Sequence, residues 1–420
     1  MNERLLQYLW QFRYYNQSAL FTITGERIDI LFPGHFNVDQ GPDFSEAKIR
    51  IGTTIWAGNV ELHLKTSDWK RHGHDGDNRY SKIILHVVWH HDIGNWPEDM
   101  PLLELRHRVS QLMLDTYAKW MMSSEALPCS GSMAQVSSLV WHSWKDRLVA
   151  ERWENKIDCI SRVTSQNREH WEETLWRLFC RYMGSQVNTE SFEQLAQHLP
   201  LNMLSKHQNQ IHQLEAMLFG TAGMLLTDTE DQYHELLKKE FAFLQHKYRL
   251  RVINKPPVFL RLRPANFPTI RLAQLAMLLH RQPRLFARLL AANTVNEMRL
   301  MLQTEPNDYW LTHYRPGIES DPYPKPLGNQ MIDTLIINAI LPVIHSYDTQ
   351  QSGRSGSRAL QWLQQLPQEN NKVTRIYATF GVDHQSAFDS QAFLQLKKHY
   401  CDPRRCLECA VAGAILKPHS

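Results

Sequence analysis

The spacing of apolar residues near the start of the chain predicts an amphipathic helix. Within residues 3–15, Leu6, Leu9 and Trp10 recur at intervals of three or four, which places their side chains on one face of a helix. Residues 27–32 are largely apolar and stop at a Pro-Gly pair, as a strand does at a turn. A helix followed by a strand is typical of an α+β domain.

Strict alternation of apolar and polar residues predicts the next strands. Residues 60–65 alternate between Val or Leu and the polar Glu61, His63 and Lys65. A strand would therefore bury one face and direct the three polar side chains to the other. Residues 47–51 form a similar run, and a hairpin would place the two strands side by side.

Two more strands complete the predicted sheet. Residues 83–89 are rich in β-branched side chains, which favours a strand near the centre of the sheet. Residues 102–105 read as a last short strand, with Pro97 and Pro101 before it. We therefore predict an α+β domain over residues 1–108.

From residue 109 onward the apolar spacing changes to three or four residues. This period predicts helices joined by short connections, and no fixed-length repeat indicates a solenoid. The second domain, residues 109–420, is therefore predicted to be all-α, with helices near 136–163, 168–183, 190–198, 207–225, 228–248, 269–280, 283–290, 294–303, 328–347, 356–366 and 388–400.

Composition indicates the class of protein and its cellular compartment. The 420 residues, 43% hydrophobic and 21% charged, are ordinary for a soluble globular protein of two domains or one large one. The sequence contains no run of eighteen apolar residues, so we predict no membrane span, and residues 1–4 do not resemble the start of a signal peptide. Six cysteines without a secretory signal favour the reducing cytoplasm.

Asp43 and Glu61 are the main candidates for chemistry. Asp43 follows a Gly-Pro pair, and a hairpin around Gly52 would bring its carboxylate close to that of Glu61. Two converging carboxylates suit a hard cation such as Mg²⁺ or Mn²⁺. His63 or Lys65 would then orient or deprotonate an attacking water. The alternative is that Asp43 only turns the chain and Glu61 is an exposed strand residue.

The same residues carry a resemblance to a known superfamily. Pro42-Asp43, followed eighteen positions later by Glu61 and then His63, resembles the motif of the PD-(D/E)xK phosphodiesterases. The early helix with Glu3 and the order of the strands also fit. The resemblance implies a restriction-endonuclease-like mixed sheet and Mg²⁺-dependent hydrolysis of DNA or RNA. His63 stands where the motif has Lys, so Lys65 is the alternative for that role.

A longer pattern resembles a second family. Gly-Pro-Asp-Phe at 41–44, Val-Glu-x-His at 60–63 and Ser-Asp-Trp-x-x-His-x-His at 67–74 are similar to an uncharacterised bacterial family known only as a domain of unknown function. This resemblance covers nearly the whole chain and implies no activity.

His72 and His74 form a second polar cluster with Asp68 and Asp77. A His-x-His pair with nearby carboxylates can bind Zn²⁺ or another transition metal, and with His63 it would support a Zn²⁺-dependent hydrolase. Two other interpretations remain open. The loop is simply solvated, or one of its histidines assists phosphate binding beside Asp43 and Glu61.

Cysteines near the carboxyl end show a spacing typical of metal sites. Cys401, Cys406 and Cys409 follow the C-x4-C-x2-C pattern of plant-type iron–sulfur proteins, in which a distant fourth Cys completes the set. Cys129 is the candidate for the fourth ligand, and some nucleases with the PD-(D/E)xK core carry such a cluster. The alternatives are a Zn²⁺ site with His399 as fourth ligand, or three partly buried thiols at the start of a helix.

A cationic segment suggests a nucleic-acid partner although the net charge is only +3. Residues 241–296 contain ten Lys and Arg and no Asp or Glu. Arg261 and Arg263, on an extended Pro-bounded stretch, and Arg271 in the helix that follows can track a phosphate backbone. The alternative is that these cations pair with acidic helices elsewhere.

The expected function is therefore that of a Mg²⁺-dependent nuclease, with Asp43 and Glu61 holding the metal and His63 or Lys65 positioning water. One alternative is a non-catalytic nucleic-acid-binding or scaffold protein on the same fold. The other is a Zn²⁺-dependent hydrolase built on His63, His72 and His74.

Overall fold

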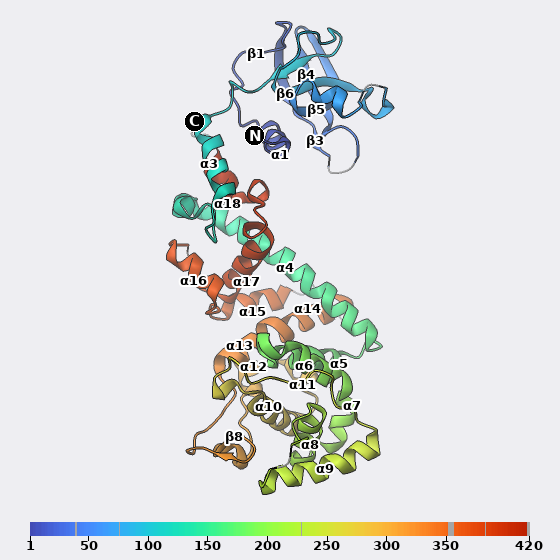
Figure 1. Ribbon diagram of the computed structural model, residues 1–420, viewed down its shortest axis with the longest axis vertical. Coiled ribbons are helices and arrows are strands. Elements are labelled where there is room, and N and C mark those ends of the chain that lie inside the picture. The colour runs from blue at the N-terminus through green and yellow to red at the C-terminus, as the bar shows by residue number, and fades with distance from the viewer. Residues whose placement is uncertain (38–39, 75, 228, 352–356, 383, 418–420) are drawn as a thin grey trace. The chain divides into compact units, whose positions relative to one another are not determined.

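The computed structural model describes residues 1–37, 40–74, 76–227, 229–351, 357–382 and 384–417. The chain divides into two compact units (Figure 1). The sheet unit comprises Met1–Trp144 together with Leu396–Ser420, and the helical unit comprises Lys145–Gln395. The predicted division at residue 108 lies close to the end of the sheet, whereas the compact units divide at Trp144.

A mixed β-sheet forms the amino-terminal part of the sheet unit. The strands run in the order β1-β2-β4-β5-β6-β7, with β3 paired to β4. Pairing is antiparallel from β1 to β5 and parallel for β5 with β6 and β6 with β7. The strands are β1 (Leu20–Phe21), β2 (Arg27–Phe32), β3 (His35–Phe36), β4 (Phe44–Ile51), β5 (Thr54–Lys65), β6 (Ile83–His90) and β7 (Leu102–Glu104).

The β4–β5 hairpin has the predicted turn. Gly52 adopts a φ of +57°, in the left-handed region that Gly enters at little cost. The antiparallel register then places Ile51 opposite Thr54 and Phe44 opposite Val60. Asp43 and Glu61 each lie one position from that last pair, so the hairpin brings them together as predicted.

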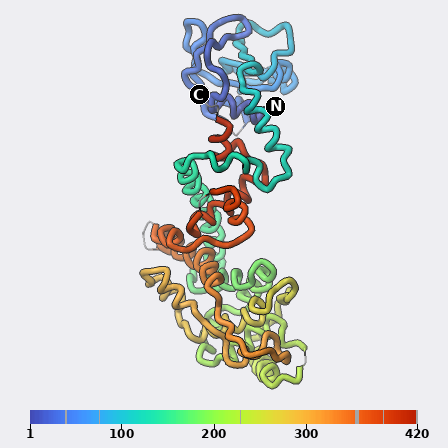
Figure 2. The backbone as a smooth tube through the Cα atoms, turned by 90° about the vertical axis from the view of Figure 1, so that its left-hand side faces the viewer, coloured from blue at the N-terminus to red at the C-terminus, as the bar shows by residue number. Residues whose placement is uncertain are grey.

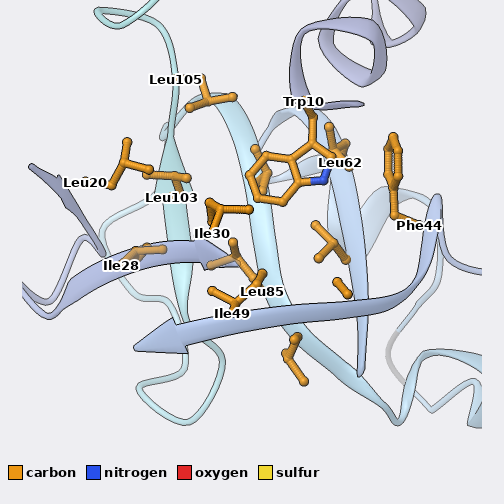
Figure 3. Close-up of a cluster of buried hydrophobic side chains, with 14 of the residues drawn as sticks. Trp10, Leu20, Ile28, Ile30, Phe44, Ile49, Leu62, Leu85, Leu103 and Leu105 are labelled. Atoms are coloured by element: carbon orange, nitrogen blue, oxygen red, sulfur yellow. The ribbon is translucent and has the colours of Figure 1, made fainter. Parts of the chain in front are cut away.

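Helix α1 (Glu3–Phe12) covers one face of this sheet. Leu6 and Trp10 are fully buried against Val60 and Leu62 of β5, among other apolar residues (Figure 3). The Trp10 indole N–H also donates to the Pro33 carbonyl at 3.0 Å. Because side chains alternate along a strand, this packing turns Glu61 and His63 to the opposite face.

Short helices complete the sheet unit. They are α2 (Asp68–Arg71), η1 (Asn78–Tyr80), α3 (Gln111–Met122), η2 (Ser130–Gln135), the π-helical η7 (Lys397–Cys401), η8 (Cys406–Glu408) and α18 (Ala410–Leu416). Helix α18 packs on α3 and η2, so the red segment in Figure 2 lies beside the teal one. Segments far apart in sequence therefore meet within this unit.

The helical unit is largely α-helical, which confirms the predicted mixed sheet followed by a large helical part. Helix α4 (Ser138–Gln166) contains the boundary between the units. A two-stranded sheet, β8 (His313–Arg315) with β9 (Ile318–Glu319), was not predicted. None of the described helices is both long and apolar enough to span a membrane. The remaining helices are α5 (Trp171–Met183), α6 (Ser185–His198), α7 (Leu201–Leu204), η3 (Ser205–His207), α8 (Ile211–Thr221), α9 (Gln232–Tyr248), η4 (Pro264–Asn266), α10 (Pro268–Arg281), α11 (Leu285–Ala291), α12 (Val295–Leu302), η5 (Asp308–Leu311), α13 (Asn329–Leu335), the π-helical η6 (Ile336–Ile340), α14 (Leu341–Gln351), α15 (Ser357–Gln365), α16 (Lys372–Thr379) and α17 (Ala387–Leu396).

Candidate metal centre

Three imidazoles converge on the face of the sheet opposite α1. His63 Nε2 lies 3.1 Å from His72 Nδ1 and 3.3 Å from His74 Nε2. One ligand nitrogen from each ring lies within 4.8 Å of the other two. Tetrahedral Zn²⁺ with bonds of about 2.0–2.1 Å holds its nitrogen ligands about 3.3 Å apart. The spacing of the histidine trio, His63, His72 and His74, therefore matches a metal site.

Local backbone geometry positions the histidine trio. His63 projects from β5, and the Asp68 carboxylate accepts the Lys65 N–H at 3.0 Å, which fixes α2 to the end of that strand. His72 follows α2 directly. Gly73 then adopts a φ of +73°, a conformation that favours Gly, and the chain turns so that His74 also reaches His63.

The trio runs from the protein interior to the surface. His63 is buried, His74 is half-buried and His72 is exposed. A metal held here would be anchored from inside and accessible from solvent on the side of His72. Catalytic metal sites need such an open position, whereas structural sites are closed by protein ligands.

A second layer of side chains orients the buried imidazole. His63 Nδ1 lies 2.9 Å from Nε2 of His86, which is fully buried on β6. The indole of Trp69 contacts both rings, and the Tyr80 ring lies 3.9 Å from that of His74 between centroids. These contacts restrict the rotation of the rings. A ligand His commonly uses its second nitrogen in this way.

Burial keeps the inner imidazoles neutral. It lowers the pKa of His63 to about 2, with further lowering from the neighbouring His86, His72 and His74. Burial likewise lowers the pKa of His86 to about 3, with smaller contributions from nearby histidines. Neutral imidazole is the form that binds metals. The site is therefore prepared for a metal at neutral pH without losing a proton from His63.

Glu61 borders the histidine trio. Its Oε1 lies 3.7 Å from His63 Nε2 and 3.5 Å from His74 Nε2. Burial, together with the charge of Asp43, raises the pKa of Glu61 to about 8. Desolvation disfavours the carboxylate form, and a nearby cation would reverse that effect. The carboxyl group is thus placed to act beside a metal on the trio.

Asp43 lies next to Glu61, as predicted, and is held by several hydrogen bonds. The Leu62 N–H donates to Asp43 Oδ2 at 3.0 Å, and the Gln7 amide donates to Oδ1 at 2.7 Å. The Asp43 N–H in turn donates to Glu61 Oε2 at 3.0 Å. Burial raises the pKa of Asp43 to about 6, and Glu3 contributes to the increase. These bonds direct Glu61 Oε1 toward the histidines.

Other residues predicted for this site lie apart from the trio. Lys65, the last residue of β5, is exposed. The Asp68 carboxylate pairs with Arg71 and accepts the Lys65 N–H. Asp77 pairs with Arg79. Of the predicted catalytic residues, Asp43, Glu61 and His63 are therefore brought together and Lys65 is not.

The predicted phosphate-contacting arginines differ in exposure. Arg261 and Arg263 are exposed in the helical unit. Arg271 is buried, and its guanidinium donates to Gln274 at 2.9 Å and to Asn266 at 2.6 Å. Arg271 therefore serves the interior of its unit, and only the other two present their charge to solvent.

The predicted cysteine set is assembled from two regions of the sheet unit. Cys129, Cys401, Cys406 and Cys409 are all buried, with 5–8% of their surface exposed. Cys129 directly precedes η2 and Cys409 directly precedes α18, and these two elements pack together. The structure thus brings the distant Cys129 to the three clustered cysteines.

Sequence reasoning missed two residues of the metal centre, His86 and Gln7. His86 lies within an apolar run that predicts a buried strand, and a single imidazole in such a run is the signal that was available. Its contact with His63 depends on the parallel pairing of β5 with β6, in which Glu61 lies opposite His86. Gln7 reaches Asp43 only because α1 packs on the sheet.

The fold and site define an α+β protein with a buried imidazole–carboxylate cluster on a mixed sheet, joined to a large helical part. A family model described as "Protein of unknown function (DUF2851)" matches residues 3–372. The chain belongs to this family, which confirms the predicted membership of a family of unknown function. No curated protein and no solved structure matches the chain.

Proposed function

We propose that this protein is a metal-dependent phosphodiesterase whose metal is bound by His63, His72 and His74. The observation that carries the proposal is the convergence of three imidazole nitrogens, with separations of 3.1 and 3.3 Å at His63 Nε2. Three nitrogen ligands with an exposed side favour Zn²⁺ or a similar transition metal over Mg²⁺. Such a metal supplies Lewis acidity and lowers the pKa of water to about 7.

Glu61 is the proposed proton acceptor. Its Oε1 lies within 3.7 Å of two of the proposed metal ligands, so a water between them would be within its reach. A general base works best when its pKa is near the working pH. The positive charge of the metal would lower the pKa of Glu61 from its raised value of about 8 toward that range.

Asp43 and His86 act as positioning residues in this proposal. The Asp43 N–H holds Glu61 Oε2 and leaves Oε1 directed at the trio. His86 Nε2 would accept the proton on His63 Nδ1, which selects the tautomer with Nε2 available to the metal. Both contacts supply orientation, and neither residue needs to touch the substrate.

The phosphodiester substrate is supported by two further features. Helix α1 and strands β2, β4 and β5 follow one another in the order implied by the resemblance to PD-(D/E)xK phosphodiesterases, with Asp43 directly before β4 and Glu61 on the neighbouring β5. Separately, Arg261 and Arg263 are exposed in a segment without acidic residues. DNA or RNA is therefore the proposed substrate, and the cytoplasm is the proposed location.

Mg²⁺ or Mn²⁺ between Asp43 and Glu61 is the second candidate. It is favoured by two buried carboxyl groups whose pKa values are both raised, since a cation between them would offset their repulsion. The first candidate fits better because hydrogen bonds already engage both Asp43 oxygens and Glu61 Oε2.

Metal analysis with activity assays tests both candidates. The full chain is purified without chelators, assayed for bound metal, and tested on bis(p-nitrophenyl) phosphate, DNA and RNA with Zn²⁺, Mn²⁺ or Mg²⁺. We expect His72→Ala to lose the metal and the activity, while the exposed control His107→Ala keeps both.

Activity of His72→Ala with Mg²⁺, abolished by Asp43→Asn, would contradict the histidine site and favour the carboxylate site. A chain that binds nucleic acid but hydrolyses nothing with any of the three metals would instead indicate a non-catalytic protein.

A further inference from the structure

Four buried cysteines outside the metal centre form a second group of soft ligands. Cys129 precedes η2, Cys401 ends η7, Cys406 begins η8 and Cys409 precedes α18. All six cysteines of the chain are described, and none forms a disulfide. A group of buried thiols that does not form disulfides is a candidate metal or cluster site.

Contacts beyond the cysteines hold the two regions together. Helix α18 packs on η2, and η7 packs on η8. Arg404, between the first two clustered cysteines, donates to the Ser123 carbonyl at 2.6 Å and to the Glu125 carbonyl at 3.0 Å. Glu408 forms ion pairs with Arg405 and with Arg4 of α1. The segment around Cys401–Cys409 is therefore fixed on the region that contains Cys129.

The contacts between short helices bring the four cysteines into one part of the sheet unit. Cys129 directly precedes η2 and Cys409 directly precedes α18, and these two elements pack together. Cys401 ends η7 and Cys406 begins η8, and these two elements also pack together. All four side chains are buried, so the thiols lie in the interior of this part of the unit.

We infer that Cys129, Cys401, Cys406 and Cys409 hold an iron–sulfur cluster. The C-x4-C-x2-C spacing with one distant cysteine is an arrangement that such clusters use. Packing of α18 on η2 brings in the distant Cys129 as the fourth thiol of such a set. A single Zn²⁺ bound by the same thiolates is the alternative that the test distinguishes.

The cluster would stabilise the part of the sheet unit that contains it. Elements η7, η8 and α18 are short, and such helices have little stability of their own. A cluster that joins them to Cys129 closes a long stretch of chain, and cross-links of that kind gain the most from restricting the unfolded state. This inference does not depend on the proposed phosphodiesterase activity.

The test measures iron, acid-labile sulfide and visible absorption in the full chain purified without oxygen. We expect about four irons and four sulfides per chain for a [4Fe–4S] cluster, or about two of each for a [2Fe–2S] cluster. Cys129→Ser and Cys406→Ser should each lose most of the iron and sulfide. The control is Cys159→Ser, since Cys159 is a half-buried residue of α4 outside the group of four. This variant should keep both the iron and the sulfide.

Stoichiometric zinc without sulfide, or neither metal in the anaerobic wild-type chain, would overturn the inference even if the serine variants fail to fold. Unchanged iron and sulfide in Cys129→Ser would also overturn it. The variant His72→Ala should retain the cluster absorption, so failure of the proposed metal centre and failure of the cluster are distinguishable.

Discussion

The Nδ1 atom of His63 lies 2.9 Å from Nε2 of His86, while Nε2 of His63 faces His72 and His74. One imidazole thus connects a buried strand neighbour to two loop histidines. Parallel pairing of β5 with β6 creates the inner contact, and the turn at Gly73 creates the outer ones. Contacts at both ring nitrogens therefore fix the orientation of the His63 side chain.

Removing the inner contact should weaken metal binding without removing a ligand. We expect His86→Phe, which keeps an aromatic ring in the buried position, to lower metal affinity 10- to 100-fold, as loss of an outer-shell partner commonly does. Competition with a chromophoric chelator measures the change. The ligand variant His74→Ala should lose binding more completely, and equal affinities for His86→Phe and the wild type would contradict the orienting role.

Replacing the proposed base should separate metal binding from catalysis. Glu61→Gln keeps the shape of the side chain and its contact with the Asp43 N–H but removes the proton acceptor. We expect the metal content to stay near the wild-type value and kcat to fall about 10²- to 10⁴-fold. Steady-state kinetics with metal analysis measures both. A parallel loss of metal would show that Glu61 is a ligand, and unchanged kcat would exclude the base role.

Trp10 should be a main source of stability for the sheet that carries the site. It is fully buried, and its indole bonds to the Pro33 carbonyl. We expect Trp10→Ala to lower the free energy of unfolding by about 3–5 kcal/mol. Hydrogen exchange of the β4 and β5 amides reports on this unit alone. The control Phe12→Ala, at a residue that is 49% exposed, should change protection far less.

Glu215 should make the stability of the helical unit depend on pH. It is fully buried and accepts hydrogen bonds from Tyr233, Asn307 and Trp310. Burial raises its pKa from 4.5 to about 7. Between these pH values the folded state binds more protons than the unfolded state. The contribution of Glu215 to the free energy of unfolding is therefore complete below pH 4.5 and decreases as the pH rises to 7.

The free energy of unfolding contributed by Glu215 should decrease by up to about 3 kcal/mol over this pH range, since each pKa unit corresponds to about 1.4 kcal/mol. Denaturant unfolding of the wild type and of Glu215→Gln at pH 4.5 and pH 7.5 measures it. The difference between the two proteins should change by that amount with pH. Parallel pH profiles would show that Glu215 titrates normally in the folded protein.

The exposed arginines should supply affinity for nucleic acid. Replacing Arg261 and Arg263 with Ala should weaken DNA or RNA binding. The slope of log K against the logarithm of salt concentration should become shallower by about one to two, because each arginine would contact one phosphate. Fluorescence anisotropy at several salt concentrations measures both quantities. The control is Arg147→Ala, which removes an exposed arginine that pairs with Glu151. Equal losses of affinity in the control and in the double variant would contradict a nucleic-acid-binding surface at Arg261 and Arg263.

Local sequence determined much of the secondary structure. Alternation over residues 60–65 correctly separated the core-facing Val60 and Leu62 from Glu61 and His63, because side chains on a strand point to opposite faces. Most helices of the second half were predicted for the corresponding reason. The β8–β9 hairpin and α16 were not, since both are short and a short element gives a periodic pattern few positions in which to appear.

Only the tertiary structure decided which residues of neighbouring strands lie opposite one another in the sheet. The sequence placed Asp43, Glu61, His63, His72 and His74 in one region, but gave no register for β5 and β6, and so did not reveal His86. Register depends on contacts between segments distant in sequence, which local patterns do not encode. It therefore decided which side chains His63 contacts.

The cysteines show the same division. Spacing in the sequence was enough to single out Cys401, Cys406 and Cys409 and left Cys129 and His399 as rival fourth partners. The structure groups Cys129 with the three because α18 packs on η2, a contact between segments more than 270 residues apart. Residue identity determines which ligand types are present, but the packing of distant helices determines which of them meet.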